Sequence, residues 1–136
     1  MTTDRVFLDA NVLFSLAYGS PGLARLWKSA NRGRSLLLAS RYVIEEARRN
    51  LDLPAQLERL ESLLAHIQIV LEADTRLPCP IEIAEKDRPV LMAAIAAKAD
   101  FLLTGDRKHF GKYFGKTVGG VKICMPRDYL LKIHQA

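Results

Sequence analysis

The feature that most constrains this fold is a pattern that occurs twice in the sequence, a short apolar run followed by an aspartate. Phe101-Leu102-Leu103 leads into a Thr-Gly-Asp turn that ends at Asp106, and Val6-Phe7-Leu8 leads directly into Asp9. Residues 87–98 are predicted to form a helix just before the second of these runs, because a proline falls in its first turn and apolar residues follow near a 3.6-residue period. A helix, a buried strand and an acidic turn are typical of a βαβ unit, where functional residues lie at the carboxyl ends of parallel strands.

The rest of the chain alternates strands and helices in the same way. Strands are expected at 6–8, 36–39, 69–71, 101–103 and 121–123, and helices at 12–17, 23–31, 41–51, from 54 onward, 87–98 and 126–133. Ser40 is expected to cap the helix after it, and Gly33 to close the helix before it. The alternation predicts an α/β fold with a mostly parallel central sheet and helices on both faces. Right-handed crossovers would then place Asp9 and Asp106 on one edge of the sheet.

Length and composition restrict the class of protein. A chain of 136 residues fits a single domain over 1–136. No apolar run reaches the ~18 residues of a membrane span, and no basic leader with an apolar segment opens the chain, so neither a membrane protein nor a secreted one is expected. Cys79 and Cys124 have neither metal-site nor disulfide spacing, which favours reduced thiols in a cytoplasm. The net charge of +5 suits an anionic partner such as RNA or DNA.

Four carboxylates can meet at the predicted edge. Asp9, Asp87 and Asp106 each have an ordinary explanation as a helix cap or turn residue. Glu46 lies about 9 Å along its helix from the edge, nearer the apolar boundary than Glu45, which remains the competitor. A cluster of oxygen ligands without thiolate selects a hard cation, Mg²⁺ or Mn²⁺. Such ions can hold a phosphodiester, activate water and stabilise a leaving oxygen.

Four segments, together with Phe110, make the chain similar to a known family: residues 7–13, 40–47, 87–94 and 99–106. In their order and spacing the chain resembles the PIN-domain ribonucleases, especially the VapC-like toxins of bacterial and archaeal toxin–antitoxin pairs. The resemblance covers nearly the whole chain. It implies a three-layer α/β/α PIN-like fold, metal-dependent cleavage of RNA, a small protein antitoxin as partner, and often a homodimer.

The resemblance also assigns roles by motif position. Its metal-binding and catalytic quartet corresponds to Asp9, Glu46, Asp87 and Asp106. The positions that support the acids or a bound water correspond to Asn11 and Thr104, although Ala10-Asn11 replaces a commoner pair that contains Thr or Ser. Some members carry a further acid where this chain reads Arg107-Lys108-His109, so a fifth carboxylate ligand is missing. His109 could contact the metal or a phosphate, but a structural or solvated histidine is the simpler explanation.

Basic residues flank the acids along the chain. The candidate RNA contacts are Arg41, Arg88, Arg107 and Lys108, together with Arg48, Arg49, Lys86 and Lys112 in the same segments. Phosphate binding by these side chains would weaken steeply with salt. Ordinary solvation explains at least half of them equally well.

Two other interpretations stay open. The first is a catalytically silent RNA- or protein-binding module on the same fold. The second is another α/β phosphoryl-transfer domain, but a haloacid-dehalogenase-like phosphatase needs Asp-x-Asp after the first strand, and here the third residue is Asn11. A response receiver needs adjacent acids near the start and a strand-borne lysine, neither of which is evident. No glycine-rich phosphate loop is present.

Overall fold

The computed structural model describes residues 3–134 and centres on one six-stranded sheet, in the order β3-β2-β1-β4-β6-β5. Its strands are β1 (Asp4–Leu8), β2 (Ser35–Ser40), β3 (Gln68–Val70), β4 (Phe101–Leu103), β5 (Thr117–Val118) and β6 (Val121–Cys124). Every neighbouring pair is parallel except β5 and β6. The predicted α/β class with a mostly parallel sheet is confirmed.

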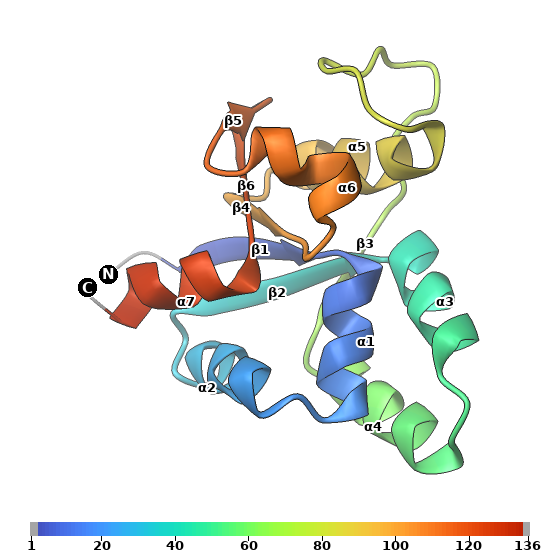
Figure 1. Ribbon diagram of the computed structural model, residues 1–136, viewed down its shortest axis with the longest axis vertical. Helices are drawn as coiled ribbons and strands as arrows, with labels where there is room; N and C mark the ends of the chain where they lie inside the picture. Colours follow the sequence, from blue (N-terminus) through green and yellow to red (C-terminus); the bar gives the residue numbers. More distant parts are fainter. Residues whose placement is uncertain (1–2, 135–136) are drawn as a thin grey trace.

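Helices cover both faces of this sheet. They are α1 (Ala10–Tyr18), α2 (Ala24–Asn31), α3 (Arg41–Asn50), α4 (Pro54–Leu64), α5 (Arg88–Ala96), α6 (Arg107–Phe110) and α7 (Pro126–His134), with 3₁₀ turns η1 (Pro21–Leu23), η2 (Glu85–Asp87) and η3 (Gly111–Tyr113). Figure 1 shows α1, α2 and α4 on one side of β1 and β2, and α5 and α6 on the opposite side. None of the described helices combines the length and the apolar character that crossing a membrane requires.

The core explains why the central strands are continuous apolar runs. Val6, Phe7 and Leu8 of β1 are fully buried, because helices pack on both faces of a parallel sheet. The strand order reverses between β1 and β4, which pair in register from Val6↔Phe101 to Leu8↔Leu103. Such a reversal opens a crevice beyond the carboxyl ends of the two strands. Asp9, the residue after β1, lies at its mouth.

The structure has one strand more than the five expected. β5 is a two-residue antiparallel partner of β6, and the turn between them is Gly119-Gly120. Both glycines have positive φ, +58° and +86°, which a tight two-residue hairpin requires. The glycine pair flanked by valines is itself a hairpin signal, and it could have been used.

The two expected helix ends differ in outcome. Gly33 follows α2 at φ +74° and donates its N–H to Ala30, as expected for a glycine that closes a helix. Ser40 stands at the N-cap of α3, but its side chain makes no capping hydrogen bond. Its buried hydroxyl has no protein partner, so the expectation of a Ser40 side-chain cap is wrong.

Candidate active site

A cavity of about 450 Å³ opens at the carboxyl edge of the sheet, and all four predicted acids line it. Asp9 follows β1, Glu46 lies midway along α3, Asp87 precedes α5, and Asp106 follows β4. The structure therefore brings together side chains from four separate stretches of the chain. We refer to this cavity as the acidic cleft.

Asp9 is the most buried of the four acids, with 4% of its surface exposed. Its Oδ1 accepts a hydrogen bond from the N–H of Ala10 (2.7 Å), and its Oδ2 accepts one from the hydroxyl of Thr104 (2.8 Å). Burial nevertheless raises the pKa of Asp9 to about 6, with a smaller contribution from the nearby carboxylates of Glu46 and Asp87. A positive charge beside Asp9 would stabilise its ionised form.

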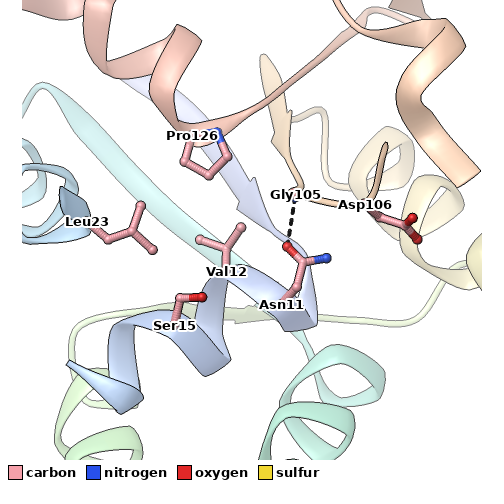
Figure 2. A pocket seen from close by; sticks show the side chains of 7 residues that line it. All are labelled: Asn11, Val12, Ser15, Leu23, Gly105, Asp106 and Pro126. Carbon is pink, nitrogen blue, oxygen red and sulfur yellow. Dashed lines mark hydrogen bonds between the residues drawn. The ribbon is translucent and has the colours of Figure 1, made fainter. Parts of the chain in front are cut away.

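Asn11 and Thr104 join the two turns that carry Asp9 and Asp106. The Thr104 hydroxyl also accepts from the Asn11 side-chain amide (3.2 Å) and from the backbone N–H of Asp106 (3.1 Å). The Asn11 carbonyl oxygen accepts from the N–H of Gly105 (2.8 Å), a bond visible in Figure 2. These contacts lock the two acidic turns to each other, although neither residue carries charge.

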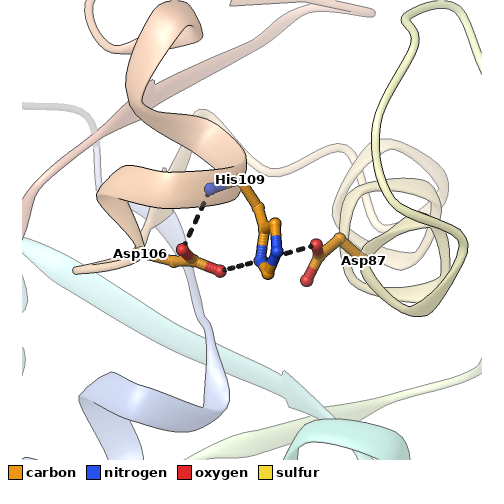
Figure 3. A group of neighbouring side chains, drawn as sticks. All are labelled: Asp87, Asp106 and His109. Atoms are coloured by element: carbon orange, nitrogen blue, oxygen red, sulfur yellow. Dashed lines mark hydrogen bonds and ion pairs between the residues drawn. The ribbon is translucent and has the colours of Figure 1, made fainter.

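The ring of His109 lies between the carboxylates of Asp106 and Asp87 (Figure 3). Asp106 accepts from the backbone N–H of His109 (3.0 Å), and its Oδ2 lies 2.7 Å from the ring Nδ1. Burial raises the pKa of Asp106, but the hydrogen bonds and charge of His109 outweigh it and hold that pKa below its usual value. One ligand atom from each of Asp87, Asp106 and His109 lies within 4.8 Å of the others, a spacing that could hold a metal ion.

Asp87 carries an oxygen without a hydrogen-bond partner. Its side chain does not cap α5, and its buried Oδ2 accepts no hydrogen bond. That oxygen lies 3.2 Å from Nδ1 of His109, but Nδ1 carries at most one hydrogen, and the shorter contact with Asp106 takes it. Burial raises the pKa of Asp87, which His109 partly offsets and Asp106 reinforces. A buried carboxylate oxygen that accepts no hydrogen bond is a feature expected of a cation-binding site, where the ion takes the place of the missing donor.

The two neighbouring glutamates of α3 point to different places. Glu46 is half-buried and lines the acidic cleft. Glu45 is exposed, forms an ion pair with Arg48, and lines a separate groove. Arg48 also pairs with Glu61 at 2.7 Å, so this candidate RNA contact is already engaged with acids.

Most of the candidate RNA contacts, among them Arg41, Arg88, Arg107 and Lys108, do not line the acidic cleft. Arg41 and Arg88 line a neighbouring groove of about 760 Å³, beside the starts of α3 and α5. Arg107 and Lys108 are exposed on α6. Within residues 3–134, Lys86 is the one cation that lines the cleft. His109, expected to be structural or solvated, contacts two of the acids, and its position three residues after Asp106 in a short helix was the available signal.

Comparisons with known proteins identify the family and the fold. A family model described as a PIN domain matches residues 5–108. A crystal structure of VapBC2 from Rickettsia felis, bound to a DNA fragment from their promoter, is similar with a TM-score of 0.62 and 15% identity, over 88% of this chain and 96% of that chain. A crystal structure of Mycobacterium tuberculosis VapC20, described as a sarcin-ricin loop cleaving toxin, is similar with a TM-score of 0.52 and 11% identity, over 76% of this chain and 91% of that chain. No curated protein matches the sequence. At these identities the structural likeness concerns the fold.

Proposed function

This chain belongs to the PIN domain family, and from that premise we propose that it is a ribonuclease that hydrolyses RNA phosphodiester bonds with Mg²⁺ or Mn²⁺. The observation that carries the proposal is the convergence of Asp9, Glu46, Asp87 and Asp106 on one cleft. The description of VapC20 as a loop-cleaving toxin supports a cleavage reaction.

The residues of the cleft fit a divalent cation. The four acids supply only oxygen ligands, which Mg²⁺ and Mn²⁺ prefer. Burial raises the pKa values of Asp9 and Asp87, and the Oδ2 of Asp87 has no hydrogen-bond partner. A cation bound beside these acids would favour their charged form. A bound divalent cation would polarise a phosphoryl oxygen and make a water molecule acidic enough to serve as a nucleophile.

The chain's own residues would orient the reacting groups. Thr104 and Asn11 hold Asp9 in one rotamer, and His109 holds Asp106. Lys86 lines the cleft with an exposed ammonium group that can receive a phosphate of the RNA. Fixed positions of this kind carry a large share of catalysis in phosphoryl transfer, because the reactants lose their freedom before reaction.

We further propose that the protein is the toxin of a toxin–antitoxin pair, with a cognate antitoxin protein as partner, and that it forms a homodimer in the cytoplasm. The similarity to VapBC2, which was crystallised with promoter DNA, supports the pairing. The two cysteines, Cys79 and Cys124, are both free, which agrees with a reducing compartment.

The test is a cleavage assay on single-stranded RNA with Mn²⁺ or Mg²⁺. Wild type and Asp52→Asn, which removes an exposed acid outside the cleft, are expected to cleave at equal rates. Asp9→Asn and Asp106→Asn are expected to be at least about 100-fold slower. Equal rates in all four proteins would remove the proposed mechanism. RNA binding by wild type without cleavage in either metal would identify a catalytically silent module instead.

A further inference from the structure

A stripe of cations runs along the exposed face of helix α2 and ends on Arg32, the residue that follows the helix. Arg25, Lys28 and Arg32 are all exposed, and the spacing of three and four residues places them within about 60° of one another around the helix. The stripe is about 10 Å long at 1.5 Å per residue. The opposite face of α2 buries Leu26 in the core, so the helix cannot turn the cations away from solvent.

These cations share one cavity without an acid. Together with Arg34, they line a hollow of about 540 Å³ whose other wall is Leu130 and Ile133 of α7. Across residues 3–134, no ion pair engages any of the four cations. Arg34 donates one hydrogen bond, to the carbonyl of Ile133 (3.3 Å). Four positive charges that face one hollow repel one another, and a polyanion would relieve that repulsion.

The floor of this hollow is fixed before any ligand arrives. The hydroxyl of Ser29 on α2 hydrogen-bonds to that of Ser35 on β2 (2.7 Å), and Ser35 to the hydroxyl of Tyr129 on α7. Tyr129 in turn donates to Asp4 on β1 (3.1 Å). This buried chain ties α2 and α7 to two strands, so binding here would cost little ordering of the helices.

The seam between α2 and α7 has a cavity at each end. At its other end lies a cavity of about 520 Å³, lined by Leu23 at the start of α2 and by Pro126 at the start of α7. The rest of that lining is Asn11, Val12, Ser15, Gly105 and Asp106 (Figure 2), and both Asn11 and Asp106 also line the acidic cleft. The two helices contact each other and run alongside β2 (Figure 1). We call the whole path the α2–α7 groove.

We propose that the α2–α7 groove binds the phosphate backbone of the RNA substrate at a distance from the bond that is cut. This inference rests on the proposed function, because it names the part of the substrate that lies outside the acidic cleft. The cationic stripe has room for about three phosphates, at 3.4 Å per nucleotide of one strand. β1 is five residues long, about 17 Å, so about five nucleotides separate the two ends of the path.

Binding is measured first, without catalysis. A fluorescein-labelled single-stranded RNA of about 20 nucleotides is titrated in EDTA at several salt concentrations, with wild type and the triple variant Arg25→Gln/Lys28→Gln/Arg32→Gln. The control Lys98→Gln/Lys116→Gln/Lys122→Gln removes the same charge from three exposed lysines outside the groove. Log K falls with log salt, and the magnitude of this slope should decrease by about 2 in the groove variant alone, because each lost phosphate contact removes ~0.7. RNA affinity near 0.1 M salt should fall at least about tenfold relative to the control.

Single substitutions guard against a folding defect. Each of Arg25→Gln, Lys28→Gln and Arg32→Gln should lower the slope by about 0.7, with an unchanged melting temperature. In Mn²⁺, the triple variant should lose cleavage efficiency on the RNA of about 20 nucleotides through a higher KM. It should lose far less on a dinucleotide, which is too short to span the cleft and the stripe together.

Three results would overturn the inference. One is a groove variant that binds RNA with the affinity and salt slope of the charge-matched control. Another is wild-type protein that binds no RNA. The third is a groove variant that keeps RNA binding but loses binding to polyglutamate, which would mark the groove as a surface for an acidic protein. Failure of the proposed function appears separately, as RNA that wild type binds normally but does not cleave.

Discussion

Asp9 is a carboxylate that the fold buries, and the free energy of unfolding should depend on its ionisation. Its pKa in the folded state, about 6, lies above the ordinary value of 3.8, so the folded protein holds the proton more tightly than the unfolded chain. The resulting stabilisation is complete below about pH 4 and is lost as pH rises through 6. In EDTA, we expect the free energy of unfolding to fall by about 1 kcal/mol between pH 5 and pH 7.

Urea unfolding at the two pH values measures this change. Asp9→Asn should reduce the fall, because the amide does not ionise, and the contribution of Asp87, whose raised pKa has the same sign, should remain. Asp52→Asn should keep the full fall, since that side chain is exposed. An Asp9→Asn protein with the wild-type pH dependence would show that the buried carboxylate carries no such cost.

His109 gives a second prediction for a single side chain. Its ring lies between Asp106 and Asp87 and sets the rotamer of the former. We expect His109→Ala to slow RNA cleavage about tenfold, the usual effect of removing a group that orients a metal ligand. His66→Ala is the matched control, because His66 is exposed and packs on Trp27 away from the cleft. Rates are compared at saturating Mn²⁺, and equal loss in both variants would contradict the assignment.

Between elements, the connection that matters is the one joining the turn after β1 to the turn after β4. Thr104 makes it with one fully buried hydroxyl, which donates to Asp9 and accepts from Asn11 and from the N–H of Asp106. Thr104→Val keeps the shape and removes all three bonds. We expect a loss of about 1–3 kcal/mol in stability, because buried polar groups lose their partner.

Activity should fall with it, by about 10- to 100-fold, since Asp9 and Asp106 are no longer held together. Urea unfolding and the cleavage assay measure the two effects on the same protein. Thr117→Val, at an exposed position in β5, should change neither. A Thr104→Val enzyme of normal activity would show that the two turns are positioned without the hydroxyl.

The order of the elements could be predicted because periodicity and turn residues agree along most of the chain. The parallel sheet follows from the alternation of helices with short apolar strands, and the edge that carries Asp9 and Asp106 follows from the parallel sheet. Strand β5 was missed because two residues carry no periodicity. The unfulfilled cap at Ser40 could not be foreseen, because side-chain capping depends on a rotamer that the local sequence does not determine.

The candidate site was partly predictable for the same reason. Aspartates at strand ends are placed by topology alone, whereas Glu46 needed the helical phase of α3 to separate it from Glu45. The contact of His109 with Asp87 could not be predicted, because it depends on how the starts of α5 and α6 face each other across the cleft. Closeness in sequence to the acids did not predict which cations line the cleft, because Arg41 and Arg88 flank the acids along the chain but line another groove.

At the scale of the whole molecule, charge is distributed unevenly. Four acids converge at the carboxyl edge of the sheet, while four cations on and just after α2, with no ion-pair partner within residues 3–134, line a hollow beside α7. The net charge of +5 is therefore compatible with a strongly negative cleft. An anionic substrate would be attracted by the cations and admitted to the cleft once a divalent ion balances the acids.

The same convergence would make cation binding a property of the folded state. The acids lie far apart in the unfolded chain and meet only in the fold, so a divalent ion should stabilise the protein. With Mn²⁺ at about 100 times its dissociation constant the gain is about 2.7 kcal/mol, or roughly 8 °C in melting temperature. Glu46→Gln should lose most of this gain, whereas Glu45→Gln should keep it, because only Glu46 lines the cleft. Thermal melts of both variants with and without Mn²⁺ measure the gain in melting temperature. An equal gain in the two variants would exclude Glu46 as a ligand.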